Sequence, residues 1–318
     1  MIRFALLSRT RTAVALAVTG LVCAVFAGPA GAASDQRRAT GADRQSAAAT
    51  RALVDPEFFD DFNYTYYTDT LLTQRGWTLK SGQAGPGVPG ATYKPANITF
   101  ATELGNKVMV LRSVSNGTAA GTEHSEIYQE RKFLKGTYAA RVYFRDTPIF
   151  GPDGDHIVQT FFTYSPLSFP MDPNYSELDF EYLPNGGWGI PSSALLATSW
   201  ETYQESPWQA VSVTTQANGS YVGWRDLVIT VDNTNIKYYV DGQLFATHSE
   251  PYLPESLMDI RFNQWLIDLT GVTSGKTRAY EEKIDYVYYA KDQVLTPAQV
   301  QTTVAAYRSA GVTFEDTV

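Results

Sequence analysis

Eight short segments of alternating or β-branched residues, separated by turn signals, constrain the fold of this chain more than any other feature. No strong helical pattern interrupts them until the end of the sequence. The segments cover residues 107–113, 136–145, 157–164, 194–200, 224–231, 236–240, 258–265 and 283–289. Short strands at this spacing are typical of a β-sandwich. The sequence therefore predicts one all-β domain over residues 54–290.

A helix is predicted after these strands. Residues 296–299 read Thr-Pro-Ala-Gln, in which the threonine can cap a first turn, the proline suits the first helical position and the glutamine completes a capping box. The helix is expected to end near Ser309, before Gly311. Its apolar positions, at spacings of four and three, are Val300, Val304 and Tyr307. Residues 291–318 are therefore expected to be a helix and tail packed on the domain.

The N-terminal 33 residues have the pattern of a secretory signal peptide. Three arginines precede an apolar run at 12–26, and Ala-Gly-Ala follows at 30–32 as a cleavage signal. Residues 34–53 are rich in Ala, Arg, Gln and Ser, which predicts a disordered leader. The single cysteine, Cys23, lies in the signal, so the mature chain has no thiol or disulfide chemistry. These patterns predict a secreted, extracellular protein.

The charge of the mature chain is strongly negative. The full sequence has 25 basic and 33 acidic residues, and the first 33 positions hold three of the basic residues and no acid, which leaves a net charge of −11. Nucleic acids and anionic membranes are poor partners for such a surface. The length after the leader fits a single domain, and we expect a monomer.

Three acids alternate with large apolar residues in the segment 176–183, which reads Ser-Glu-Leu-Asp-Phe-Glu-Tyr-Leu. On a strand, Glu177, Asp179 and Glu181 would share one face and the apolar side chains would share the other. Like charges in a row repel one another and shift each other's pKa, so the arrangement gives no structural benefit. Chemistry is its best explanation.

The spacing of the acids fits a known mechanism. Four strand residues span roughly 13 Å, and two glutamates that lean toward each other can approach the separation of about 5–5.5 Å used in retaining glycoside hydrolysis. Asp179 could share a hydrogen bond with the nucleophile, and its negative field could keep Glu181 protonated. Two alternatives stay open on the residues alone: a solvated acidic strand face, or a calcium site.

The motif at 177–181 resembles the catalytic signature of glycoside hydrolase family 16, in the form without an extra bulge residue that licheninases and xyloglucan endotransglycosylases have. The resemblance extends over about residues 55–290. Further segments that resemble the family, in the family's order, are 58–63, 124–126, 136–138, 158–164, 235–242, 263–265 and 285–287.

The resemblance implies a curved, concanavalin A-like jelly-roll sandwich with an open cleft for a β-glucan chain across its concave sheet. It implies that Glu177 is the nucleophile, Asp179 its assistant and Glu181 the acid/base. The expected activity is that of a secreted, retaining endo-β-glycanase acting on O-glycosyl bonds. A transglycosylase on the same glycans and a non-catalytic carbohydrate-binding sandwich are the alternatives.

Other positions match the family's cleft. The resemblance implies that Trp265 stacks on a sugar beside Asn263 and that Glu126 lies in the cleft, although core packing of Trp265 and a surface ion pair of Glu126 are open alternatives. Weaker candidates on expected cleft strands are Tyr93, Asn97, Tyr128 and Trp200. Before the acidic motif, where licheninases have tryptophan, this chain has Asn-Tyr-Ser at 174–176, which gives no support for mixed-linkage specificity.

One position resembles a metal ligand. Asp285 lies where some members of the family bind a structural calcium, and a capped turn or a salt bridge is the alternative. Catalysis by two carboxylates requires no cofactor.

Overall fold

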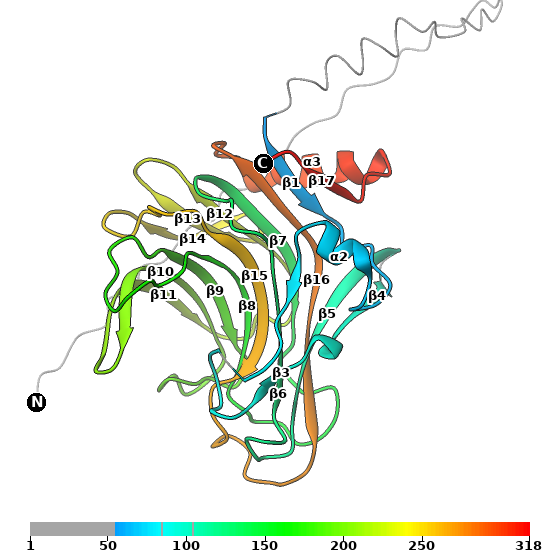
Figure 1. Ribbon diagram of the computed structural model, residues 1–318, viewed down its shortest axis with the longest axis vertical. Coiled ribbons are helices and arrows are strands. Elements are labelled where there is room, and N and C mark those ends of the chain that lie inside the picture. The colour runs from blue at the N-terminus through cyan, green and yellow to red at the C-terminus, as the bar shows by residue number, and fades with distance from the viewer. Residues whose placement is uncertain (1–54, 84, 104) are drawn as a thin grey trace, which may run out of the picture. The chain divides into compact units, whose positions relative to one another are not determined.

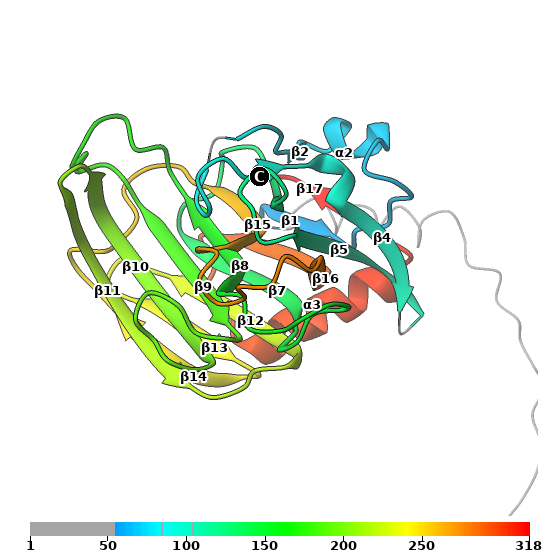
Figure 2. The ribbon, with the colours of Figure 1, turned by 90° about the horizontal axis from the view of Figure 1, so that it is seen from below.

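The computed structural model describes residues 55–83, 85–103 and 105–318, in which two layers of antiparallel strands face each other (Figures 1 and 2). The first layer curves and has the strand order β11-β10-β9-β8-β15-β6-β2. Its strands are β2 (Thr78–Leu79), β6 (Glu123–Tyr128), β8 (Ile157–Tyr164), β9 (Glu177–Leu183), β10 (Ala194–Glu205), β11 (Trp208–Asn218) and β15 (Asp259–Leu266).

The second layer has the order β14-β13-β12-β7-β16-β5-β4. Its strands are β4 (Ile98–Glu103), β5 (Asn106–Ser115), β7 (Gly136–Phe144), β12 (Gly223–Val231), β13 (Ile236–Val240), β14 (Gln243–His248) and β16 (Arg278–Lys291). Next to β16 lies β1 (Glu57–Asp60), and β17 (Phe314–Asp316) pairs with the other edge of β1. The first and last strands therefore meet.

Short elements connect the layers. They are α2 (Thr70–Gln74), the 3₁₀-helix η2 (Pro95–Asn97) and β3 (Thr92–Tyr93), which pairs in parallel with β6. A single pairing of Val114 in β5 with Glu123 in β6 also joins the two layers. Among the described residues, no helix has the length and apolar character that a membrane span needs.

The core lies between the layers and is built by alternation. In β9, Leu178, Phe180 and Tyr182 point into it and are fully buried. Across the layer, Phe161 and Phe262 stack with ring centroids 5.3 Å apart. Because one face of each strand supplies this apolar interior, the polar residues between are left for the open face of the curved layer.

The C-terminal helix α3 (Pro297–Ser309) covers the outer face of the second layer, as Figure 2 shows. Its N-terminus has the predicted capping box between Thr296 and Gln299. Val300 and Val304 pack on an apolar patch contributed by β1, β7, β12 and β16, and Tyr307 stacks on Phe59 at 4.8 Å. The predicted β-sandwich with a C-terminal helix is confirmed. The expected signal peptide at 1–33 and leader at 34–53 lie outside the described residues.

Candidate active site

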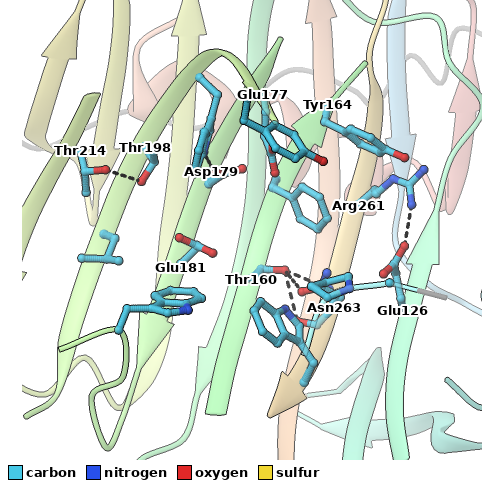
Figure 3. A pocket seen from close by; sticks show the side chains of 18 of the residues that line it. Glu126, Thr160, Tyr164, Glu177, Asp179, Glu181, Thr198, Thr214, Arg261 and Asn263 are labelled. Atoms are coloured by element: carbon cyan, nitrogen blue, oxygen red, sulfur yellow. Dashed lines mark hydrogen bonds and ion pairs between the residues drawn. The ribbon is translucent and has the colours of Figure 1, made fainter. Parts of the chain in front are cut away.

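The three acids of β9 lie in the middle of the curved layer. Their strand is paired with β8 on one side and β10 on the other, so that Glu181 lies opposite Thr160 and Glu177 lies opposite Trp200. All three side chains line a cleft of about 810 Å³ on the open face (Figure 3). The two faces of β9 are therefore those that its sequence predicts: the carboxylates point toward the cleft, and the large apolar side chains lie in the core.

Asp179 is the most deeply buried of the three acids. Its Oδ2 accepts a hydrogen bond of 2.7 Å from Nε1 of Trp200, whereas its buried Oδ1 has no N–H or O–H donor among the described residues. Burial, followed by the negative charges of Glu177 and Glu181, raises the pKa of Asp179 well above its ordinary value. The neighbouring charges of Glu177 and Glu181 thus favour a proton on Asp179 over a third negative charge in the cleft.

Glu177 is held by Tyr175, whose hydroxyl donates to its Oε2. Burial raises the pKa of Glu177, while the interactions with Tyr175 and Asp179 and the positive charge of Arg261 oppose the rise. The carboxylate form is therefore the form that its neighbours stabilise, which suits a nucleophile.

The side chain of Glu181 has no ion pair or hydrogen bond to another described residue. Burial and the charge of Glu177 raise its pKa to about 8, which suits a proton donor at neutral pH. The sequence predicted that the field of Asp179 keeps Glu181 protonated, whereas the charge that raises the pKa of Glu181 here is that of Glu177.

Beside the acids, Asn263 and Thr160 form the floor of the cleft (Figure 3). The hydroxyl of Thr160 donates to Oδ1 of Asn263 at 2.8 Å, and the backbone N–H of Asn263 donates to that hydroxyl at 3.0 Å. Trp265 also lines the cleft, although only 8% of its surface is exposed, and its ring lies 5.7 Å from that of Trp188. Trp265 thus serves as core packing and as cleft wall at once.

A charged network extends the cleft toward β6. Glu126 forms ion pairs with Nη1 of Arg261 at 2.5 Å and with Nζ of Lys80 at 2.9 Å, and all three side chains line the cleft. The guanidinium of Arg261 lies between the rings of Tyr128 and Tyr164, at 4.1 and 4.2 Å from their centroids. Glu126 thus lies in the cleft, and its ion pairs are buried rather than on the surface, because its side chain is only 2% exposed.

Three weaker candidates do not line the cleft. The Tyr93 hydroxyl donates to the carbonyl of Pro86, and its side chain is buried. Asn97 belongs to η2 rather than to a cleft strand, and its amide donates to Glu123 at 3.3 Å. Tyr128 supports Arg261 through its ring. Trp200, in contrast, lines the cleft and contacts Asp179 directly.

Asp285 does not fit a calcium ligand. Its Oδ1 accepts from Nη2 of Arg308 at 2.8 Å, and its Oδ2 lies 3.2 Å from Nη1 of Arg308 and 3.5 Å from Nη1 of Arg141. No group of three or more His, Cys, Asp or Glu residues in the described parts of the chain could hold a metal ion. Since calcium needs six to eight oxygen ligands, two guanidinium groups oppose it here, and the salt-bridge alternative describes this position.

Several cleft residues were missed by sequence reasoning. They are Lys80, Thr160, Phe162, Tyr164, Tyr175, Trp188, Tyr203, Trp208 and Arg261. Tyr175 could have been found, because it lies two residues before Glu177 and so shares its parity along the strand. The others carry no signal of their own, since their position depends on which strands become neighbours.

Comparisons with known proteins agree with the fold. The chain matches no protein-family model and no curated protein. The solved β-glucanase of Bacillus licheniformis has 20% sequence identity and a TM-score of 0.53, and the match covers 74% of this chain and 98% of that one. A glycoside hydrolase family 16 endo-glucanase from Bacteroides ovatus has 16% identity and a TM-score of 0.55, with 72% and 98% covered.

A laminarinase from Flavobacterium sp. UMI-01 is similar to the same extent, with 15% identity, a TM-score of 0.51 and coverage of 73% of this chain and 98% of that one. At these identities the likeness establishes the architecture. The protein therefore has the curved jelly-roll sandwich that the sequence predicted.

Proposed function

We propose that this protein is a retaining endo-β-glycanase of glycoside hydrolase family 16 that hydrolyses a β-glucan-type polysaccharide. One observation carries the proposal: three acids share one strand face in an open cleft, where burial raises the pKa of each and none has a lysine or arginine partner among the described residues. The jelly-roll fold, the motif at 177–181 and the similarity to solved β-glucanases support it.

In the first step, the Glu177 carboxylate attacks the anomeric carbon while Glu181 gives its proton to the glycosidic oxygen. The bond between that carbon and that oxygen breaks, the aglycone leaves as an alcohol, and an ester joins the sugar to Glu177. Tyr175 holds the attacking group in place through its hydrogen bond to it, and Asp179 is its neighbour on the same strand face. The loss of the negative charge on Glu177 also lowers the pKa of Glu181, which favours the proton transfer.

In the second step, Glu181 is the base. It takes a proton from a water molecule whose oxygen attacks the anomeric carbon from the side the aglycone left, and the ester bond breaks. The sugar keeps its anomeric configuration, Glu177 regains its charge, and Glu181 regains its proton. Neither step needs a metal ion or cofactor. We propose a secreted enzyme, in keeping with the signal-peptide pattern at 1–33.

The test compares the unaltered mature protein with Glu177→Gln and Glu181→Gln on soluble mixed-linkage β-glucan, laminarin and xyloglucan, with products separated by size. Cleavage of at least one glycan by the unaltered protein, and its loss in both variants, would support the proposal. Hydrolysis by Glu177→Gln at the unaltered rate would refute it. Products longer than the substrate would show transfer to a sugar acceptor, and binding without turnover would show a carbohydrate-binding sandwich.

A further inference from the structure

The β10–β11 hairpin presents an aromatic cluster at its tip. Trp208, the first residue of β11, pairs with Glu205, the last residue of β10. Its side chain is 65% exposed, and its ring centroid lies 5.9 Å from that of Tyr203 and 6.4 Å from that of Trp200. All three aromatic residues line the same cleft as the acids. An exposed aromatic group of this size contributes little to a core, so packing alone does not explain it.

The cluster is continuous with the catalytic acids. Trp200 donates its indole N–H to Asp179, as described above. The ring of Tyr203 lies 5.2 Å from that of Tyr175, whose hydroxyl donates to Glu177. The exposed ring of Trp208 is therefore connected, through its contacts with Trp200 and Tyr203, to the groups beside the nucleophile and its assistant.

The position of the cluster follows from strand register. Because Trp200 pairs with Glu177, residues 203–208 lie beyond the Glu177 end of β9, toward the sheet edge that β11 forms. Trp265 pairs with Val158 near the start of β8, and the start of β8 lies beside the Leu183 end of β9. Trp265 and its ring neighbour Trp188 therefore lie at the end of β9 opposite to Glu177. The acids thus lie between two aromatic surfaces, and the surface at Trp208 extends the cleft away from the reacting bond.

We infer that the platform formed by Trp208 and Tyr203 is a distal sugar subsite, which stacks on the apolar face of a pyranose remote from the cleaved bond. The inference rests on the proposed function. A ring with C–H groups on one face and hydroxyls at its rim suits a rigid aromatic surface, which buries the apolar face and leaves the rim in water. The platform therefore selects for long chains over short ones.

The experiment measures kcat/KM for mixed-linkage gluco-oligosaccharides and laminari-oligosaccharides of increasing length. The variants are Trp208→Ala, Trp208→Phe and, as a matched control, Tyr66→Ala, because Tyr66 is 68% exposed but does not line the cleft. We expect the loss in Trp208→Ala to grow with chain length to about tenfold, the size of a good aromatic contact. Trp208→Phe should recover most of it, and Tyr66→Ala should match the unaltered protein.

Two outcomes would overturn the inference, and they differ in what else they affect. A loss in Trp208→Ala that is equal at every chain length would show that Trp208 only supports Trp200, while the proposed hydrolase would stand. If the unaltered protein cleaves none of these glycans, and Glu177→Gln binds none of them in affinity electrophoresis, both the proposed function and the subsite fall.

Discussion

The acids of β9 in the cleft and the acids beside α3 on the outer face have opposite surroundings. In the cleft, Glu177, Asp179 and Glu181 form no ion pair with any described lysine or arginine. On the outer face, Asp61 and Asp285 are both bridged by Arg308 from α3, and Arg141 lies within 3.5 Å of Asp285 and 3.8 Å of Asp226. The residue types are the same, and only the neighbours differ.

The difference teaches how one fold separates stability from reactivity. An ion-paired carboxylate links two elements, here the helix and the sheet. A buried carboxylate without a cation costs folding free energy, but its affinity for a proton is raised and can be used in a reaction. The three acids of β9 are therefore left for a reaction, whereas the acids beside α3, like Glu126 elsewhere in the cleft, are held in ion pairs.

The largest expected effect is on the rate in the cleft. Glu181→Gln should lower kcat about 10²–10⁴-fold, because the leaving oxygen loses its proton donor. Glu177→Gln should lower it at least as much, because no ester can form. Initial rates on a cleaved glycan measure both, and circular dichroism checks the fold. Asp61→Asn, on the outer face, should keep the unaltered rate; a comparable loss there would erase the distinction between the faces.

The next effect is on stability at the outer face. Arg308→Ala should lower the free energy of unfolding by about 1–3 kcal/mol, because it leaves Asp61 and Asp285 without their shared partner. Urea unfolding measures the change. Arg112→Ala, which removes a more exposed partner of Glu281, serves as control and should cost about 0–1 kcal/mol. Equal costs for the two variants would contradict the bridging role of Arg308.

The pH dependence of the rate should reflect the raised pKa values of Glu177 and Glu181. Activity requires ionised Glu177 and protonated Glu181. As the pH is lowered, the rate should begin to fall while the pH is still above 4.5, the ordinary glutamate pKa, because Glu177 takes up a proton. As the pH is raised, the rate should fall near about pH 8, because Glu181 loses its proton. A profile of kcat/KM against pH tests this, and an alkaline limb that starts near pH 5 would contradict the assignment of Glu181.

The raised pKa of Glu181 also makes the stability of the fold depend on pH. Because the pKa of Glu181 is higher in the folded than in the unfolded state, the folded protein binds more protons between about pH 4.5 and 8. Its contribution to stability is present below pH 4.5 and is lost as the pH rises through the folded pKa. Melting temperatures of the unaltered protein and Glu181→Gln across this range should diverge, with a flatter curve for the variant.

The smallest expected effect is that of calcium. Because Arg308 and Arg141 already neutralise Asp285, added calcium or a chelator should leave the melting temperature unchanged. Differential scanning calorimetry in both conditions is the measurement. A rise of several degrees with calcium would contradict this prediction.

Local sequence patterns predicted those features whose cause is local. Alternation in β9 indicated which side chains face the cleft, and the capping box located the start of α3 at Pro297. The place of Arg261 could not be predicted, because its partner Glu126 lies 135 residues away and is reached only through the pairing of β15 with β6. Asn97 was misplaced because its segment forms a 3₁₀ turn, which a strand pattern does not reveal.

The pairing of β1 with β17 has a consequence for the order of folding. Glu57 and Thr317 exchange hydrogen bonds across a sequence separation of 260 residues, and β17 covers the edge of β1. During synthesis that edge has to wait until nearly all of the domain has been made, so the sandwich closes as a late, non-local event. One edge of β1 in the nascent chain therefore stays unpaired until β17 has been made.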